Sequence, residues 1–441
     1  MQALISASRI NIHAAATAGG INPRVVALLM VASFINYVDR GSLATAAPLV
    51  REDFGLSSTQ LGLLLSAFFW SYAPGQVPAG WLTERLDAHR VLACGLAIWG
   101  AATALAGLAT GFATLLVLRM LLGCGESVMF PASFKILACE ANEGQRGRAN
   151  GFLASGVYLG SAFGTLIGAL LMARLGWRLV FIAAGCASLL WLLPWWRMPK
   201  SPATYRTQAP GNVPSMLTLL GRRELWGSCA GAFCGAYALY LVVTWLPLYL
   251  VKSRGFSMAQ MAPIGAVVYM LAAAAAVLTG WLTDRWLASG ASGTRVRKVT
   301  LLAGFGGLAV CFSVCAYAGH LGSLVALAGC GVFLGTKAAA LYNCVQTLAG
   351  PTASAQWMGV QNTCANIAGI TAPLITGILV DRTGSFTAAF LIAATLAVLG
   401  IVAFGVVVRR IEPIDWNRYA LPNKCSIDAR SLARPAGASG Y

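Results

Sequence analysis

The feature that most constrains this chain is a succession of twelve long apolar blocks, which fill almost its whole length. A helix needs about 20 residues to cross the hydrocarbon core of a bilayer. Because the blocks lack the strict alternation of a barrel strand, transmembrane helices are predicted. The blocks lie near residues 25–50, 60–82, 91–110, 113–138, 149–173, 179–196, 226–250, 260–282, 299–318, 321–348, 357–380 and 387–408.

The composition excludes a soluble globular protein. Hydrophobic residues make up 58% of the chain and charged residues only 10%, whereas about a quarter of the residues in soluble proteins are charged. A multi-pass protein whose solvent is the lipid bilayer is therefore expected. Residues 1–24 lack the compact apolar segment of a signal peptide, so no cleavage is predicted.

The net charge of +17 is distributed by topology. The loops after even-numbered blocks carry thirteen Lys and Arg residues, and the loops after odd-numbered blocks carry six. Since cytoplasmic loops are enriched in these residues, both termini are predicted to be cytoplasmic. The basic charge is thus no sign of nucleic-acid binding, and no nucleic-acid partner is expected.

The sequence repeats itself at an offset of 200 residues. GWLTER at 80–85 returns as GWLTDR at 280–285, each at the end of a second block. Two parallel halves with a substrate site between them are a transporter design. The predicted organisation is a cytoplasmic tail at 1–24, six-helix bundles at 25–197 and 225–409 joined by a cytoplasmic linker at 198–224, and a second cytoplasmic tail at 410–441.

Very few charges fall deep within the apolar blocks. They are Asp39, Arg40, Arg119, Glu126 and Lys337, with Lys135 nearer a block end. Arg119 and Glu126 are separated by ~10 Å along a helix axis, which is too far for a direct pair. We expect Asp39 and Arg40 on the first span to supply their partners. A static ion-pair network is the alternative, although desolvation makes such pairs poor stabilisers.

Charges at this depth predict a proton-coupled carrier. Burial disfavours the charged form of a carboxyl group and a neighbouring guanidinium favours it, so a moving partner switches proton binding. Asp39 and Glu126 are predicted to carry the coupling protons, and Arg40 to attract an anionic substrate. Lys337 suits a dicarboxylate if it faces the cavity; a position in the cytoplasmic vestibule is the alternative.

Several segments carry a resemblance to a known family. GWLTER resembles the cytoplasmic loop motif of the major facilitator superfamily, with Glu84 where that motif usually has Asp and Asp87 where it usually has Gly. Five further segments together resemble the anion:cation symporter family within it. They are NYVDR (36–40), RMLLGCGESVMFPAS (119–133), TWLPLYLVKSRG (244–255), GVQNTCANIAGITAPLITG (359–377) and RIEPIDW (410–416).

The resemblance implies an all-α major facilitator fold of twelve transmembrane helices in two six-helix halves. It implies proton-coupled import of a sugar acid, either an aldonate, a hexuronate or an aldarate. Asp39 and Glu126 match the family's protonated pair, and Arg40 matches its carboxylate-binding arginine. The other candidates for substrate binding are Tyr37, Tyr72, Arg119, Lys337, Asn362 and Asn366, and those for gating are Gly80, Glu84, Arg85, Asp284 and Arg285.

Two positions depart from the family pattern. Val157 and Ala236 stand where relatives often carry a polar side chain, which favours a less hydroxylated substrate. Import of aromatic or small carboxylates is therefore an alternative to sugar-acid import. An exporter of the same fold and a non-transporting sensor are others, and sodium coupling remains open.

No enzymatic activity is expected, because His13, His89 and His320 lie in the tail or loops. No catalytic residue, metal or cofactor is predicted. We expect a monomer in the bacterial inner membrane, with an organic anion, protons and the lipid bilayer as its partners.

Overall fold

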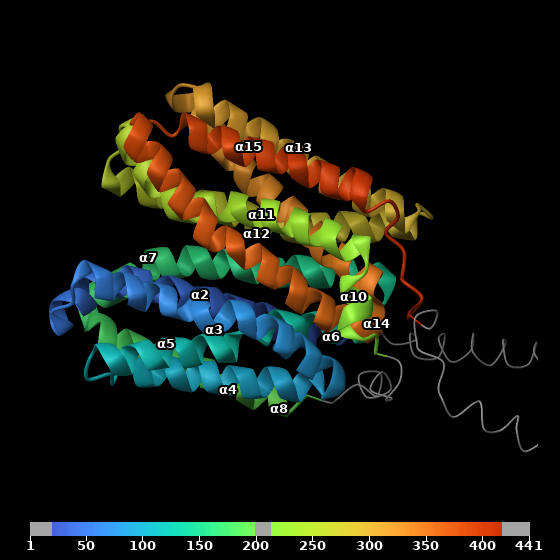
Figure 1. The fold of residues 1–441 in the computed structure, drawn as a ribbon, viewed down its shortest axis with the longest axis horizontal. Coiled ribbons are helices and arrows are strands. Elements are labelled where there is room, and N and C mark those ends of the chain that lie inside the picture. The colour runs from blue at the N-terminus through green and yellow to red at the C-terminus, as the bar shows by residue number, and fades with distance from the viewer. Residues whose placement is uncertain (1–19, 199–212, 417–441) are drawn as a thin grey trace, which may run out of the picture.

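The computed structural model describes residues 20–198 and 213–416, and these form an all-helical bundle without strands (Figure 1). Much of the predicted tails and linker lies outside the described residues, so the predicted boundaries stay proposals. The helices are α2 (Pro23–Phe54), α3 (Ser58–Arg85), α4 (Ala88–Ala106), α5 (Phe112–Glu126), α6 (Met129–Glu140), α7 (Glu143–Leu190), α8 (Leu192–Trp196), α10 (Met216–Leu220), α11 (Arg223–Leu248), α12 (Met258–Ala288), α13 (Gly293–Tyr317), α14 (His320–Thr383) and α15 (Thr387–Val402), with short π-helical turns at Tyr249–Ser253 and Ala403–Val407.

Local signals explain where several helices begin and end. Asn22 caps α2 through its side chain, and Pro23 starts the helix, where its missing N–H costs nothing. Gly55 ends α2 with a φ of 59°, a conformation that glycine adopts without strain. Ser57 and Gln60 form a reciprocal capping box at the start of α3.

The expected spans map onto these helices with two kinds of difference. α7 and α14 each run through two predicted spans and break only at a glycine with positive φ, Gly176 (75°) and Gly350 (64°). The fourth predicted span is divided after Glu126 into α5 and α6. With these breaks the helices are consistent with twelve spans, and eight helical stretches of the described chain are long and apolar enough to cross a membrane.

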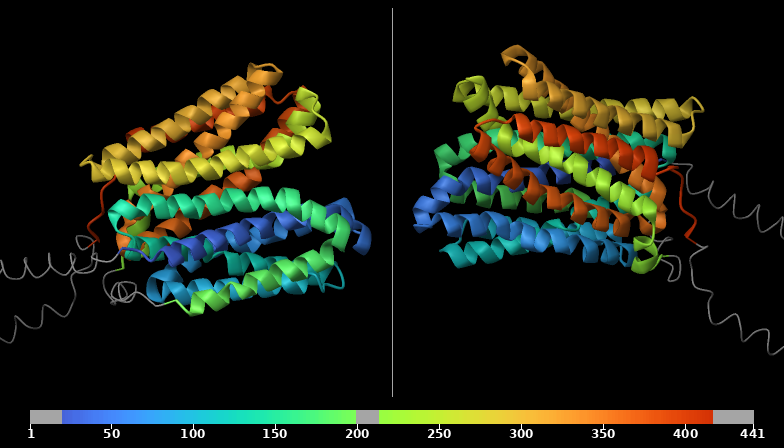
Figure 2. Two further views of the ribbon diagram at one scale, coloured as in Figure 1. Left: turned by 180° about the vertical axis from the view of Figure 1, so that it is seen from behind. Right: turned by 45° about the horizontal axis from the view of Figure 1, so that its top comes forward.

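The helices form two bundles. The first comprises α2 to α8 and the second α10 to α15; α7 packs against α12, and α14 packs against α3, α6 and α7 (Figures 1 and 2). We call the end of the molecule that holds the α3–α4, α6–α7 and α12–α13 turns the linker end. The other end is called the opposite end.

Glycines on α7 bring its backbone against α2. A Cβ on Gly156 would lie 2.3 Å from the carbonyl oxygen of Met30, and one on Gly160 would lie 2.3 Å from that of Phe34. Small residues at this spacing allow such close helix contacts. The contact fixes the segment of α2 that carries Asp39 and Arg40.

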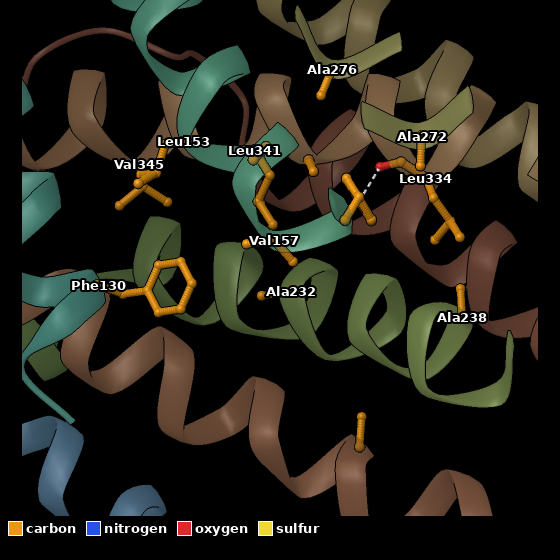
Figure 3. Close-up of a cluster of buried hydrophobic side chains, with 14 of the residues drawn as sticks. Phe130, Leu153, Val157, Ala232, Ala238, Ala272, Ala276, Leu334, Leu341 and Val345 are labelled. Carbon is orange, nitrogen blue, oxygen red and sulfur yellow. Dashed lines mark hydrogen bonds between the residues drawn. The ribbon is translucent and has the colours of Figure 1, made fainter. Parts of the chain in front are cut away.

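Apolar side chains fill much of the space between the bundles. Phe130 of α6, Val157 of α7, Ala232 of α11 and Leu341 of α14 gather in one region (Figure 3). Phe130 and Ala232 are buried, at 3% and 4% exposure. The polar groups described next therefore lie in a largely apolar surround.

Candidate transport site

The first bundle holds four charged side chains, two on α2 and two on α5. The Nε atom of Arg40 donates a hydrogen bond to Oε2 of Glu126 at 3.1 Å, and Glu126 is fully buried. Asp39 is 2% exposed and lies beside Arg119 and Glu126. Of the two charges on α5, Glu126 thus has an ion-pair partner on α2, whereas neither carboxylate oxygen of Asp39 makes a hydrogen bond within the described chain.

Aromatic rings surround the guanidinium of Arg40. Its Cζ lies 4.2 Å from the ring centroid of Tyr72, 4.8 Å from that of Tyr37 and 5.2 Å from that of Phe68. Cation–π attraction holds a guanidinium over such faces. Its Nη2 atom is buried and makes no hydrogen bond within the described chain, so this donor is available to a ligand.

Next to Arg40 lies a cavity of about 80 Å³ between the two bundles. Tyr37 and Arg40 line it from the first bundle, and Lys337, Asn362 and Asn366 line it from α14. The cavity thus brings together five of the residues expected to bind substrate. The side chains of Val157 and Ala236 also line it, so both departures from the family pattern face this space.

Two expected substrate residues lie behind the cavity wall. Tyr72 is 1% exposed, and its hydroxyl accepts a hydrogen bond from Nδ2 of Asn362 at 3.2 Å. Arg119 is 4% exposed, with its Cζ 5.4 Å from the ring centroid of Phe68. Tyr72 therefore contacts two cavity residues, whereas Arg119 belongs to the charged group around Asp39.

At the linker end, Asp284 of α12 ties the second bundle to the first. Its Oδ1 accepts the backbone N–H of Gly147 at 2.8 Å, and its Oδ2 accepts that of Arg148 at 2.8 Å. The Nε atom of Arg148 lies 3.4 Å from Oδ2. Since Asp284 is 5% exposed, three donors of α7 compensate for burying its charge.

Glu84 of α3 makes the related contact from the first bundle. Its Oε1 accepts the backbone N–H of Ala355 on α14 at 2.7 Å, and its Oε2 forms an ion pair with Lys135. Glu84 and Lys135 are both fully buried. The two copies of the repeated motif therefore each place an acid on a backbone N–H of the other bundle.

The glycine that opens each copy lets the bundles meet. A Cβ on Gly80 would lie 2.5 Å from the carbonyl oxygen of Ala355, and one on Gly280 would lie 2.3 Å from that of Gly147. Arg85 and Arg285 instead point away from the other bundle. They are exposed, with Cζ atoms 4.0 Å and 5.4 Å from the ring centroids of Trp81 and Trp281.

The molecule thus has a cavity between two bundles and, at the linker end, a latch formed by the contacts of Glu84 and Asp284 with backbone N–H groups of the other bundle. Comparison with known proteins identifies the family. The sequence model for the Major Facilitator Superfamily matches residues 29–292 and 287–427. The chain belongs to this superfamily. Its expected all-α major facilitator fold is thereby confirmed.

Its relatives within the major facilitator superfamily are named for organic anions. The chain is 31% identical to the probable sulfoacetate transporter SauU of Cupriavidus necator, over 86% of this chain and 92% of the relative. It is 30% identical to the probable galactarate/D-glucarate transporter GudP of Bacillus subtilis (88% and 92% covered). It is 30% identical to a probable L-galactonate transporter of Escherichia coli (90% of each covered). The expected resemblance to the anion symporter branch is confirmed, and the chain is a transporter, not an enzyme.

Solved structures share the fold. The crystal structure of the major facilitator transporter FucP in the outward conformation matches with a TM-score of 0.68 and 19% identity, over 87% of this chain and 98% of that one.

Three tyrosines of the cavity lining are not among the residues predicted from the sequence to bind substrate. Tyr158, Tyr240 and Tyr342 line the cavity, and the hydroxyl of Tyr240 donates to Oδ1 of Asn366 at 3.2 Å. An isolated tyrosine in an apolar span has the same appearance in sequence whether it packs in the core or faces a cavity. Only their depth, similar to that of Asn362 and Lys337, could have suggested them.

Proposed function

We propose that this chain imports an organic carboxylate together with protons, by alternating access. Sugar acids (aldonates, hexuronates and aldarates) are the proposed class, because relatives that align over nearly their whole length are named for them. The observation that carries the proposal is the buried Arg40–Glu126 pair beside the cavity between the bundles.

Arg40 is proposed to bind the substrate carboxylate. It lines the cavity, its Nη2 donor has no hydrogen bond within the described chain, and three aromatic rings hold its guanidinium. Charge-assisted hydrogen bonds of this kind are about twice as strong as neutral ones.

Glu126 and Asp39 are proposed to carry the coupling protons. When Glu126 takes up a proton, its attraction for Arg40 falls and the guanidinium becomes available to the substrate carboxylate. Loss of that proton restores the Arg40–Glu126 pair, which competes with the substrate and favours release. Asp39, beside both Glu126 and Arg119, adds a second buried carboxyl to this exchange.

The linker-end contacts are proposed to form the closed gate. Among the described residues, the side-chain hydrogen bonds between bundles run from Asp284–Gly147 and Glu84–Ala355 at the linker end to Tyr158–Leu334 near mid-helix. Access would therefore come from the opposite end. The excess of basic residues on linker-end loops supports a cytoplasmic linker end, cytoplasmic termini and an inner-membrane location.

A smaller, less hydroxylated carboxylate is the second candidate substrate. Val157 and Ala236 line the cavity and offer no hydrogen bond to a sugar hydroxyl. The relative named for sulfoacetate supports the same alternative.

The test is uptake into proteoliposomes under an inward proton gradient without sodium, with an aldonate, a hexuronate, an aldarate, sulfoacetate and an aromatic carboxylate as labelled substrates. Accumulation of one acid that a protonophore abolishes is the expected result. Export of a lipophilic dye under the opposite gradient, with no accumulation of any acid, would replace the proposal by an exporter.

A further inference from the structure

The cavity holds a second cation that the proposed carboxylate-binding arginine leaves unused. Lys337 of α14 is 5% exposed and lines the same cavity as Arg40, from the other bundle. Within the described chain, no Asp or Glu oxygen lies within 4 Å of its ammonium nitrogen. Its charge is thus buried without an ion pair.

Two glycines make room for this side chain. A Cβ on Gly235 of α11 would lie 2.6 Å from Nζ of Lys337, and a Cβ on Gly304 of α13 would lie 2.7 Å from its Cβ. The second bundle therefore holds the lysine in a slot between α11 and α13. Packing against these two glycines, rather than a free choice among side-chain conformations, therefore sets the position of the ammonium group.

A buried charge is normally paired, because taking it out of water costs more than any other burial. Arg40 has Glu126 in the empty protein, but Lys337 has no such internal partner. In a carrier that closes around its cargo, the natural counter-ion for such a group is an anionic group of the substrate.

We propose that the substrate is a dianion, with one acidic group held by Arg40 and the other by Lys337. The inference rests on the proposed function and narrows it to diacids, whether two carboxylates or a carboxylate and a sulfonate. Because the two cations belong to different bundles, a dianion joins the bundles electrostatically. A monoanion on Arg40 leaves Lys337 unpaired.

The hydrogen bonds among the cavity amides agree with a substrate recognised mainly by charge. Nδ2 of Asn366 donates to the backbone oxygen of Asn362, and Oδ1 of Asn366 accepts from Tyr240. Nδ2 of Asn362 is engaged with Tyr72. Asn362 and Asn366 are thus largely occupied within the protein, whereas Oε1 of Gln361, also in the lining, has no hydrogen-bond partner among the described residues. Arg40 and Lys337 are the two cations of the lining that an anionic ligand would meet.

The experiment compares substrates that differ in charge at constant size. Galactarate is paired with galactonate, and sulfoacetate with its monoanionic amide. Uptake by proteoliposomes is measured for the wild type, for Lys337→Met, and for Lys298→Met as a matched control. Lys298 donates to the carbonyl oxygen of Gly405 and does not line the cavity.

The wild type is expected to take up the dianion of a transported pair at least about 10-fold more efficiently than the monoanion. Lys337→Met should lower dianion uptake by about 10- to 100-fold and monoanion uptake by less than about threefold, as loss of one hydrogen bond to a charged group implies. Lys298→Met should leave both rates unchanged.

Gly235→Ala is a second variant, because its Cβ would displace the ammonium of Lys337 rather than backbone. It should reproduce the selective loss at an unchanged melting temperature, even if Lys337→Met fails to fold.

Equal uptake of monoanion and dianion by the wild type would overturn the inference while leaving anion import intact. Equal loss of both substrates in Gly235→Ala would do the same, by making the lysine slot structural. Absence of uptake for every acid would instead overturn the proposed function.

Discussion

Replacing Asp284 by asparagine tests whether the linker-end contacts form the gate. The carboxylate accepts two backbone N–H groups at 2.8 Å each. Asparagine keeps one acceptor oxygen but turns its NH₂ group toward the second N–H, so one hydrogen bond to a charged acceptor is lost. Such a bond contributes about 1.5–3 kcal/mol. A change of about 1.5–3 kcal/mol raises the ratio of linker-open to linker-closed molecules by about 10- to 150-fold.

The assay uses a thiol that is protected while the gate is closed. Ser354 is fully buried and directly precedes Ala355, the residue bonded to Glu84. Ser354→Cys is introduced after the exposed and half-buried cysteines and the tail cysteine are replaced; these are Cys94, Cys124, Cys139, Cys186, Cys364 and Cys425. The maleimide labelling rate of the purified protein then reports the linker-open population.

Asp53→Asn is the matched control. Asp53 pairs with Arg178 at 3.0 Å within the first bundle at the opposite end, so the same chemical change there should leave labelling at residue 354 unaltered. If Asp284→Asn is labelled no faster than Asp53→Asn, the linker-end contacts do not hold the gate and the reasoning fails.

One further prediction concerns the linker-end contacts, and two concern the proposed proton-carrying residues. Gly80→Ala should also speed labelling at residue 354, since overpacking against the Ala355 carbonyl costs about 1–3 kcal/mol. An unchanged rate would mean that the closed contact accommodates the added methyl group without loss of stability. Glu126→Gln should keep substrate binding, measured by calorimetry, but lose accumulation driven by a pH gradient; full accumulation would assign the proton elsewhere. If Asp39 and Glu126 each carry one proton, dianion uptake moves no net charge. A potassium diffusion potential should then leave it unaltered, and acceleration by an inside-negative potential would contradict this stoichiometry.

The spans could be predicted from sequence because the bilayer imposes a length and a composition on every helix that crosses it. The breaks within α7 and α14 fall in the gaps that the sequence predicts between spans, at 174–178 and 349–356. Their shortness could not be predicted, because each break needs only one glycine with positive φ, Gly176 or Gly350.

The Arg40–Glu126 ion pair could be anticipated from the sequence for a different reason. So few charges lie deep in the spans that Glu126 had almost no partner except Arg40. At a helix end, water and many polar groups are available as partners, so the sequence does not determine the direction of a charged side chain there. Glu84 and Arg85 are neighbours in one motif, yet Glu84 faces the other bundle and Arg85 turns outward onto Trp81.

Asp87 carries a helix-capping signal that is easily overlooked when the segment is compared only with the superfamily motif. It departs from the glycine usual at this point of the superfamily motif, and it caps α4 by accepting the N–H of His89 at 3.0 Å. Aspartate is among the preferred residues for this task. The departure therefore has a structural cause in the start of the next helix.

The latch at the linker end binds main-chain groups, and this has a consequence for how such proteins can diverge. Glu84 accepts a hydrogen bond from the backbone N–H of Ala355, and Asp284 accepts hydrogen bonds from those of Gly147 and Arg148. Every residue except proline has such a backbone donor. The side chains of Ala355 and Arg148 can therefore change without removing these backbone hydrogen bonds, whereas a Cβ on Gly147 would lie 2.3 Å from Oδ1 of Asp284. The proposed proton-carrying groups, Asp39 and Glu126, lie wholly in the first bundle, whereas Lys337 lies in the second. A chimera that joins this first bundle to the second bundle of a relative should therefore keep Arg40 and the proposed proton-carrying groups, while the cavity residues that α14 supplies are exchanged.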